Sequence, residues 1–308
     1  MSSTRRVALA LGSGGARGYA HIGVVEELRE RGFEIVTIAG SSMGALVGGL
    51  TAAGRIDDFA AWATRLSQRD VLRLMDPKWS APGAITADRL LAEMADLFSG
   101  LQIEDLPIPF TAVATDLVAR REVWFQRGPL LSAVRASIAI PGLFTPVMIN
   151  GRLLVDGGLM NPIPIEPTAA VPVDLTIAVS LLGPRSPRES ATPMKVSAAP
   201  QRFEEWRERL RKTVSSVTGR DEALAKEPDN DDTGMQALPA DLRLTEVTGL
   251  SVEAMQGLVS RYRMAGLPPD VLISVPADAA RTLDFHRAKD MIELGRTVTA
   301  TALTAAGH

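Results

Sequence analysis

Five residues near the start of the chain carry the strongest chemical signal in the sequence. Gly40-Ser41-Ser42-Met43-Gly44 fits the pattern Gly-x-Ser-x-Gly, in which a serine stands on a sharp turn between a strand and a helix. The apolar stretch Ile35–Ala39 precedes it and Ala45–Ala53 follows it, as the pattern requires. Ser42 is therefore a candidate nucleophile at a helix N-terminus, whose partial positive charge favours developing negative charge. The alternative is an ordinary turn with a capping serine.

A serine nucleophile needs a base, and the sequence offers two kinds. Of the three histidines, His308 is the terminal residue, His21 falls in the first turns of an expected helix, and His286 lies near the start of the last expected helix. The carboxylate alternative is Asp156, which ends the apolar stretch Leu153–Val155 just before two glycines. A partly buried Asp with a raised pKa could take the serine proton directly. An Asx turn ahead of a glycine pair is the other interpretation.

A glycine-rich loop, Ser13-Gly14-Gly15-Ala16-Arg17-Gly18, follows the apolar stretch Val7–Leu11. Backbone N–H groups in such a loop can converge on an anion, either a phosphate or an oxyanion. A P-loop would end in Gly-Lys-Ser/Thr, whereas this loop ends in Arg17-Gly18-Tyr19. A dinucleotide site stays open because Glu34 follows at a suitable distance, but it leaves Ser42 without a role. Because both loops follow neighbouring parallel strands, we expect an oxyanion hole beside the nucleophile. Simple turn formation is the alternative.

The order of elements around these motifs indicates an α/β fold. Strand and helix signals alternate in the first third of the chain, which predicts parallel strands joined by right-handed crossovers. The expected strands are Val7–Leu11, Ile35–Ala39, Phe110–Asp116, Glu122–Phe125, Leu153–Asp156, Leu175–Ser180 and Val271–Val275. The expected helices are Tyr19–Arg31, Ala45–Ala53, Ile56–Leu66, Thr86–Leu97, Pro129–Ile138, Val252–Met264 and Phe285–Thr304. The glycine loop, the serine and the aspartate would then lie at one edge of the sheet.

Length and composition fit one large α/β domain: 308 residues, of which 46% are hydrophobic and 22% are charged. The net charge of −3 gives no sign of a nucleic-acid partner. The absence of Cys excludes disulfides, thiolate zinc sites and cysteine nucleophiles. The motifs require neither a metal nor a cofactor. The apolar stretch Ile35–Ala53 is broken by Gly40-Ser41-Ser42, so we expect strand, turn and helix rather than a membrane span. We expect a soluble, cytoplasmic chain whose only membrane contact would be peripheral.

The composition changes after Gly183. Residues 184–233 are rich in Pro, Ser and charged side chains, which predicts a surface insertion that is partly disordered. Residues 1–183 and 234–308 would then form a single domain. Within the insertion, residues 202–217 carry their apolar side chains at helical spacing. This helix could be a lid that contacts membranes or, in the interpretation we prefer, a helix that covers the core.

Several stretches of the sequence together resemble one family. They are Leu11–Gly18 with Ala20–Val24, Ala39–Leu46, Ala136–Phe144, Asp156-Gly157-Gly158 with Asn161–Pro164, and the tail pieces Pro269–Ile273 and Asp284-Phe285. The first set is similar to the oxyanion loop and first helix of bacterial patatin-like phospholipases, including neuropathy-target-esterase-like members, and Ala39–Leu46 is similar to their nucleophile elbow. Ala136–Phe144 resembles the segment before their Asp-Gly-Gly motif, Asp156-Gly157-Gly158 with Asn161–Pro164 resembles that motif, and the tail pieces are similar too. The resemblance covers about residues 7–182 and, more thinly, 250–296.

The resemblance implies a three-layer α/β/α sandwich with a mostly parallel central sheet. It also implies a catalytic dyad of Ser42 and Asp156 without histidine, and cleavage of lipid acyl esters without calcium. The loop Ser13–Gly18 would form the oxyanion hole. The glycines that shape the two other motifs would be Gly40, Gly44, Gly157 and Gly158.

Two positions depart from the family pattern. Ser13 stands where the family usually has Gly, so we expect the first turn of the loop to be less free to adopt a positive φ. Met43 stands where a small residue is common, and we expect it to crowd the acyl pocket.

The sequence therefore predicts a serine esterase that acts on lipids: a phospholipase A, a lysophospholipase or an esterase that works through an acyl-enzyme on Ser42. Two alternatives stay open. An α/β-hydrolase esterase would use Ser42, Asp156 and His286 in the correct chain order, but only two strands fit ahead of the serine, where that fold needs several. A non-catalytic module would use the glycine loop to hold a nucleotide or a lipid. The sequence indicates neither the oligomeric state nor the particular lipid.

Overall fold

The structure is a computed structural model that describes residues 4–74, 83–85, 88–185 and 244–308. Contacts divide the chain into one unit of residues 1–186 with 251–308 and a second unit of residues 187–250. The first unit carries every residue of the candidate site. The expected helix 202–217 lies outside the described residues, and the expected division into one domain with an insertion stays a prediction.

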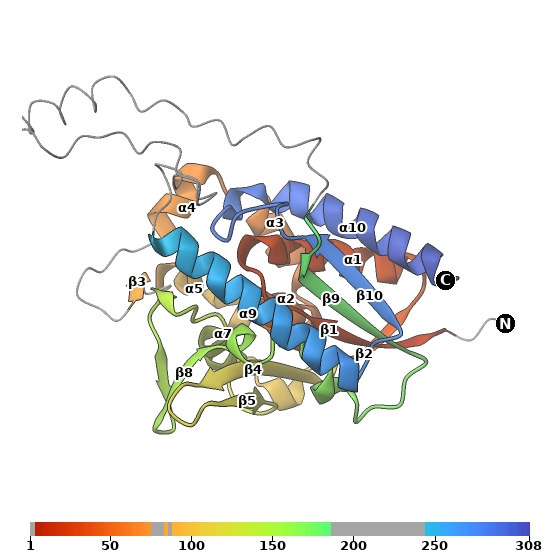
Figure 1. The fold of residues 1–308 in the computed structure, drawn as a ribbon, viewed down its shortest axis with the longest axis horizontal. Helices are drawn as coiled ribbons and strands as arrows, with labels where there is room; N and C mark the ends of the chain where they lie inside the picture. The colour runs from red at the N-terminus through yellow and green to blue at the C-terminus, as the bar shows by residue number, and fades with distance from the viewer. Residues whose placement is uncertain (1–3, 75–82, 86–87, 186–243) are drawn as a thin grey trace, which may run out of the picture. The chain divides into compact units, whose positions relative to one another are not determined.

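A mixed eight-stranded sheet lies at the centre of the first unit, within the part of the chain that the structure describes (Figure 1). Its strands are β1 (Arg6–Leu11), β2 (Glu34–Ser41), β4 (Phe110–Asp116), β5 (Arg121–Phe125), β7 (Val147–Ile149), β8 (Arg152–Asp156), β9 (Leu175–Gly183) and β10 (Val271–Pro276). The strand order is β10-β9-β1-β2-β4-β8-β7, and β5 pairs with β4 off this path. Pairing is parallel from β10 to β4, whereas β5 and β8 run antiparallel to β4. The expected α/β class is confirmed.

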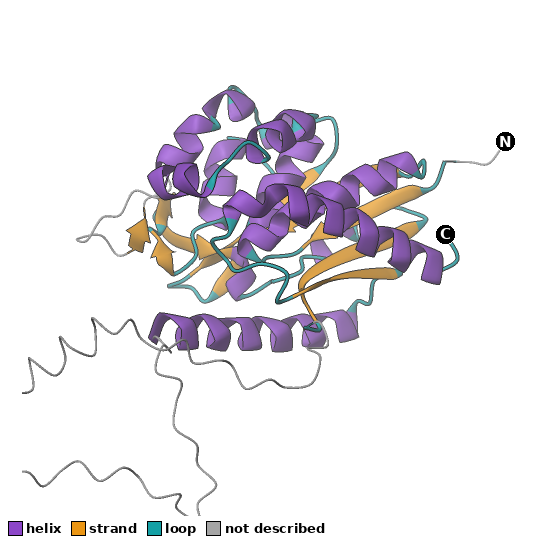
Figure 2. Cartoon of the chain, turned by 90° about the horizontal axis from the view of Figure 1, so that it is seen from above, coloured by secondary structure: helices purple, strands orange, loops and turns teal. Residues whose placement is uncertain are grey.

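Alternate residues of each strand face opposite sides of the sheet, and this alternation decides what covers each side. Leu9 and Leu11 of β1 belong to the large core that the helices cover. Ala10 and Ala178 point the other way and form a small cluster against which the C-terminal end of α9 (Leu244–Gly266) packs. Figure 2 shows α9 on one side of the sheet and α10 on the other, which gives the expected three layers.

The remaining helices that the structure describes are α1 (Ala20–Glu30), α2 (Met43–Ala52), α3 (Ile56–Ala63), α4 (Gln68–Leu74), α5 (Asp88–Glu93), α6 (Ala95–Phe98), α7 (Leu130–Ser137) and α10 (Ala288–Ala305). A short strand pair, β3 (Gly83–Ile85) with β6 (Gly142–Phe144), lies apart from the main sheet. The single helix expected over Thr86–Leu97 is instead the pair α5 and α6. They are separated at Met94, whose φ of −100° and ψ of 5° leave helical geometry and whose side chain is buried.

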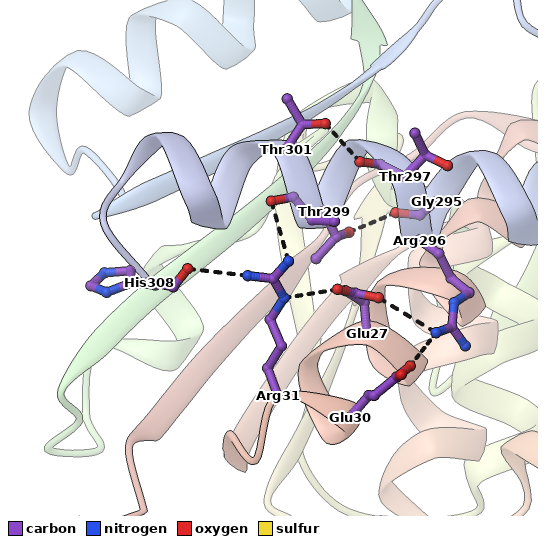
Figure 3. A network of polar contacts seen from close by, with 10 residues as sticks. Glu27, Glu30, Arg31, Gly295, Arg296, Thr297, Thr299, Thr301 and His308 are labelled. Atoms are coloured by element: carbon purple, nitrogen blue, oxygen red, sulfur yellow. Dashed lines mark hydrogen bonds and ion pairs between the residues drawn. The ribbon is translucent and has the colours of Figure 1, made fainter.

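Helices α1 and α10 approach so closely that only glycine fits where they meet. A Cβ on Gly23 would lie 2.0 Å from the carbonyl O of Ile292, and a Cβ on Gly295 would lie 2.0 Å from the carbonyl O of Ala20. Around this contact, Arg296 of α10 forms ion pairs with glutamates of α1 (Figure 3). Because these ion pairs are partly exposed, backbone packing contributes more than charge to holding α1 in place.

The sheet brings the expected motifs to one region. Leu11 at the end of β1 lies opposite Gly40 of β2, so the glycine loop and the serine turn leave the sheet side by side. Strand β4 pairs with β2 on the side of β2 that faces away from β1. It also pairs with β8, where Ala114 of β4 lies opposite Asp156 of β8. The stretch 35–53 forms a strand, a turn and a helix, as expected. No helix among the described residues is both long and apolar enough to cross a membrane.

Candidate active site

Ser42 occupies the turn between β2 and α2 in a backbone conformation that non-glycine residues rarely adopt. Its φ is 57° and its ψ is −126°, and such strain persists only where the surroundings enforce it. Two glycines allow the turn to close: a Cβ on Gly40 would lie 2.2 Å from the carbonyl O of Gly44, and a Cβ on Gly44 would lie 2.1 Å from that of Leu11. The structure therefore contains the sharp strand-to-helix turn that the sequence pattern predicts.

The hydroxyl of Ser42 donates a hydrogen bond of 2.5 Å to Oδ2 of Asp156. The other carboxyl oxygen, Oδ1, accepts a bond of 2.7 Å from the N–H of Gly158. The backbone of Asp156 is fixed as well, because its N–H donates to the carbonyl O of Ala139 at 2.9 Å and its carbonyl O accepts from Oγ1 of Thr115 at 3.0 Å. Both members of the pair are almost closed to solvent, at 1% exposed for Ser42 and 3% for Asp156.

Burial raises the pKa of Asp156 from its ordinary value of 3.8 to about 6. Hydrogen bonds from the Ser42 hydroxyl, the Gly158 N–H and the Ser13 side chain act in the opposite direction, because they favour the ionised form. The result is a carboxylate that is ionised at neutral pH and yet more basic than an exposed Asp. Such a group can accept the proton of a neighbouring hydroxyl.

The two glycines after Asp156 bring its turn close to the strands and to the glycine loop. A Cβ on Gly157 would lie 2.1 Å from the carbonyl O of Val113, and a Cβ on Gly158 would lie 2.3 Å from Oγ of Ser13. The left-handed conformation in the glycine loop falls on Gly15, with a φ of 57°, while Ser13 keeps a negative φ. The conformational restriction that we expected from a serine at this position therefore has no cost here.

Two N–H groups of the glycine loop have no acceptor among the described residues. The N–H groups of Ser13 and Ala16 donate to backbone carbonyls at 2.8 and 3.0 Å, so they are already committed. Those of Gly14 and Gly15 have no such partner, and Gly15 lines the same cavity as Ser42. Within the predicted oxyanion loop, these two residues are the ones able to donate to a developing oxyanion.

Arg17 fixes the glycine loop from inside. Its Nε donates to the carbonyl O of Gly14 at 3.1 Å, its Nη1 to that of Ala277 at 2.5 Å, and its Nη2 to Glu253 of α9 at 2.7 Å. The side chain is only 3% exposed. The geometry therefore indicates that Arg17 holds the loop in place.

Ser137, at the end of α7, is a functional residue that the sequence analysis missed. Its Oγ accepts a bond of 2.9 Å from the N–H of Ser42 and donates one of 2.5 Å to the carbonyl O of Val113. The strained elbow is thus tied to β4, and the N–H of Ser42 is not available to an oxyanion. Its segment belongs to the family resemblance, but nothing in the sequence links Ser137 to a residue 95 positions away.

A second missed group holds the turn that follows Asp156. The main-chain carbonyl O of the buried Asn161 accepts a bond of 2.6 Å from Oγ of Ser41, and its side-chain Nδ2 donates to Glu122 at 2.8 Å. Arg263 of α9 pairs with Glu122 at 2.8 Å and with Glu166 at 2.9 Å. Through these bonds, the turn after Asp156 is connected to β2, β5 and α9. The members of this network come from four separate parts of the chain, so no local pattern could reveal it.

The histidines take no part in the pair. His21 is completely buried, and its Nε2 lies 2.8 Å from the carbonyl O of Gly12. Burial lowers its pKa to about 4, so it is neutral at ordinary pH. His286 lies exposed in the short 3₁₀ helix Phe285–Arg287, and the carboxyl group of Asp156 accepts no bond from a histidine among the described residues. No cluster of three or more His, Asp or Glu in the described part of the chain could hold a metal ion.

An apolar cavity opens beside the serine. Its lining, among the described residues, is Gly15, Tyr19, Ser42, Met43, Leu46, Phe59, Trp62, Leu66, Val71, Leu74, Leu90, Met94, Ile138, Ile140, Phe144 and Phe285. Met43 reaches the cavity wall through close packing on Gly18, where a Cβ would lie 2.3 Å from that of Met43. Met43 lies in the cavity wall, and the crowding that we expect from it stays a prediction. The cavity suits an apolar chain attached to a carbonyl carbon at Ser42.

We expect Asp156→Asn to stabilise the protein at pH 8. A carboxyl group with a raised pKa destabilises the folded state when it ionises, so the penalty is present above pH 6, shrinks as the pH falls, and vanishes below about pH 3.8. The difference between 3.8 and about 6 corresponds to at most about 3 kcal/mol. Urea denaturation of the wild type and of Asp156→Asn, at pH 8 and at pH 4, measures the difference in their free energies of unfolding.

The exposed carboxylate Asp57, 85% exposed on α3, provides the matched control, because Asp57→Asn should change stability by less than about 0.5 kcal/mol at either pH. A destabilised Asp156→Asn at pH 8, or a gain that persists at pH 4, would contradict a raised pKa in the folded protein.

Comparison with known proteins places this geometry in a family. The family model described as patatin-like phospholipase matches residues 9–169, which include the glycine loop, the serine turn and the aspartate turn. A solved structure, VipD from Legionella pneumophila, matches with a TM-score of 0.47 and 13% identity over 98% of this chain and 67% of its own.

Relatives extend the match over nearly the whole chain. An uncharacterized NTE family protein of Mycobacterium bovis is 46% identical over 99% of this chain and 93% of its own length. A lysophospholipase of Cryptococcus neoformans, NTE1, is 37% identical over 53% of this chain and 10% of its own length. The chain belongs to the patatin-like phospholipase family and, among its members, to the NTE family for which its full-length relatives are named.

Proposed function

We propose that this protein hydrolyses lipid acyl esters through a covalent acyl-enzyme, with Ser42 as nucleophile and Asp156 as base. The observation that carries the proposal is the buried 2.5 Å hydrogen bond between the two side chains beside an apolar cavity. Family membership supports a lipid acyl hydrolase in general, and one relative is named a lysophospholipase. Phospholipase A, lysophospholipase and simple esterase activities all share this chemistry.

Acylation begins when the Ser42 oxygen attacks the ester carbonyl carbon while its proton passes to Oδ2 of Asp156. The N–H groups of Gly14 and Gly15 donate to the oxyanion that forms. Loss of one such donor typically costs roughly 3 kcal/mol of transition-state stabilisation. The bond to the leaving alcohol then breaks, and its oxygen takes the proton back from Asp156.

Deacylation repeats the same steps with water as the nucleophile. Asp156, ionised again, accepts a proton from a water molecule that attacks the acyl carbon, and the Ser42 oxygen leaves with that proton. Throughout the cycle the acyl chain occupies the apolar cavity, where each buried CH₂ group contributes roughly 0.8 kcal/mol. A chain of several carbons is therefore held without any polar anchor of its own.

Two rival functions make different demands on the site. A Ser-Asp-His triad needs a histidine bonded to Asp156, and His286 lies exposed with no such bond. A non-catalytic module needs a loop that binds an anion. That role would leave unused the short Ser42–Asp156 bond and the apolar cavity next to it.

Intact-mass analysis after treatment with a fluorophosphonate probe tests the proposal. We expect one adduct on the wild type, none on Ser42→Ala, and a labelling rate on Asp156→Asn lower by about 100-fold or more, because the base is lost. His286→Ala should label like the wild type. Ser260→Ala is a matched control, since Ser260 is a buried serine whose hydroxyl donates, within the described part of the chain, to the carbonyl O of Gln256 alone.

The outcomes separate the three functions. Loss of labelling in His286→Ala would favour the triad, and no labelling of a folded wild type would favour the binding module. An adduct on Ser42→Ala would place the reactive group elsewhere.

Peripheral membrane contact stays a prediction, and α9 offers a surface that suits it. Met255 and Leu258 are 56% and 61% exposed on this helix, and apolar side chains in such positions partition into lipid. We expect the protein to float with phosphatidylcholine vesicles, and Leu258→Glu to reduce the bound fraction. Val118→Glu, at a side chain 75% exposed in another region, is the control. Equal flotation of both variants and the wild type would contradict contact through α9.

A further inference from the structure

The middle of the glycine loop is a peptide group that lies between two glycines. Gly14 is extended, with a φ of 168°, and Gly15 is left-handed, with a φ of 57°. Glycine adopts either sign of φ, so neither residue fixes the plane of this peptide group. The C=O of Gly14 and the N–H of Gly15 both belong to it, and because it is planar and trans they point in opposite directions. Whatever holds the carbonyl therefore also sets the direction of the N–H.

Arg17 holds that carbonyl with a charged donor. Gly14 precedes the 3₁₀ helix Gly15–Tyr19 and offers its C=O to the first turn, but hydrogen bonds of the 3₁₀ type have poor geometry. Nε of the Arg17 guanidinium donates to the same oxygen at 3.1 Å, and the charge of the donor strengthens this bond. In the function we propose, the N–H of Gly15 is one of two donors to the oxyanion. The direction of that donor therefore depends on where the Arg17 side chain lies.

Glu253 of α9 in turn holds the Arg17 side chain. The Arg17 side chain is only 3% exposed, and a charge removed from water is unfavourable unless an opposite charge lies beside it. Nη2 of Arg17 bonds to Oε1 of Glu253 at 2.7 Å, and Nη1 donates to the carbonyl O of Ala277. Within the described part of the chain, Glu253 is the acid that pairs with Arg17. Loss of its carboxylate would leave a buried charge unpaired, which favours movement of the guanidinium toward water and away from Gly14.

We propose that Glu253 is a positioning residue for the reaction: by pairing with Arg17, it holds the Gly14–Gly15 peptide group so that the N–H of Gly15 faces the oxyanion. The proposal rests on the proposed function, since it concerns the transition state of that reaction. Glu253 is not among the described residues that line the cavity, so it acts through Arg17 and the loop. Its loss raises the free energy of the transition state and leaves the binding of the acyl chain unchanged.

The test measures kcat and KM for para-nitrophenyl butanoate, a soluble ester whose cleavage needs no contact with a membrane. Glu253→Leu, which removes the carboxylate, should lower kcat by about 100-fold, the size of the loss of one oxyanion donor, and change KM by less than about twofold. Glu253→Gln keeps the shape and an acceptor oxygen but loses the charge, and should lower kcat by about tenfold. Arg17→Lys keeps both charges, but one ammonium group cannot replace the guanidinium fork, so kcat should again fall by about 100-fold.

A second measurement isolates the transition state. A trifluoromethyl ketone with the same acyl chain adds to a nucleophilic serine and forms a tetrahedral oxyanion where the ester carbonyl would lie. Its inhibition constant should rise in each variant by the factor by which kcat/KM falls. Glu26→Leu is the matched control, because Glu26 of α1 is a glutamate of similar exposure, 33% against 26%, that pairs with Arg296 of α10. It should keep the wild-type kcat and inhibition constant.

The outcomes separate this assignment from the proposed function. Wild-type kcat in a folded Glu253→Leu would show that the ion pair only supports the fold, and a raised KM with unchanged kcat would place Glu253 in substrate binding. Either result overturns the assignment and leaves the proposed hydrolase intact. If Glu253→Leu does not fold, wild-type kcat in both Glu253→Gln and Arg17→Lys overturns it as well. Failure of the folded wild type to cleave the ester would contradict the proposed function, and the assignment with it.

Discussion

The hydrogen bond between Ser42 and Asp156 is the interaction on which the rest of the site depends. It requires a carboxylate that is buried yet ionised, and burial alone would hold that group neutral at higher pH. Donors from the serine, from the turn after the aspartate and from Ser13 keep its pKa at about 6. The sheet makes this possible because β4 pairs with parallel β2 on one edge and with antiparallel β8 near its end. The two side chains thus meet although 114 positions separate them.

Both loops around this bond are held rigid by groups outside it. Ser137 ties the strained elbow to β4, and Arg17 ties the glycine loop to its own carbonyl, to residue 277 and to α9. Helix α9 also holds the aspartate turn through Arg263. The N–H groups of Gly14 and Gly15 have no acceptor among the described residues. In the function we propose, loops held in this way would offer these two donors to the oxyanion with little reorganisation. The buried charge reduces the stability of the fold, as expected of a site built for function.

Local patterns predicted the parts of the site that depend on local geometry. The glycines around Ser42 and after Asp156 indicate positions where backbone segments approach closely. The apolar strands that precede Ser42 and Asp156 predict that both residues lie at the same edge of the sheet. Contacts between distant segments could not be predicted. Nothing in the sequence joins Ser137 to the elbow, or Asn161 and Arg263 to Glu122, because these contacts depend on how strands and helices pack.

The pH dependence of kcat/KM for a soluble acyl ester tests the central claim most directly, since it reports the ionisation of the base in the free enzyme. The account predicts an acidic limb with a midpoint near pH 6, set by Asp156, that is unchanged in His286→Ala. Activity should fall about tenfold for each pH unit below that midpoint. A midpoint near 4 would mean that the base is an ordinary exposed carboxylate. A limb that disappears in His286→Ala would assign the base to histidine and contradict the dyad.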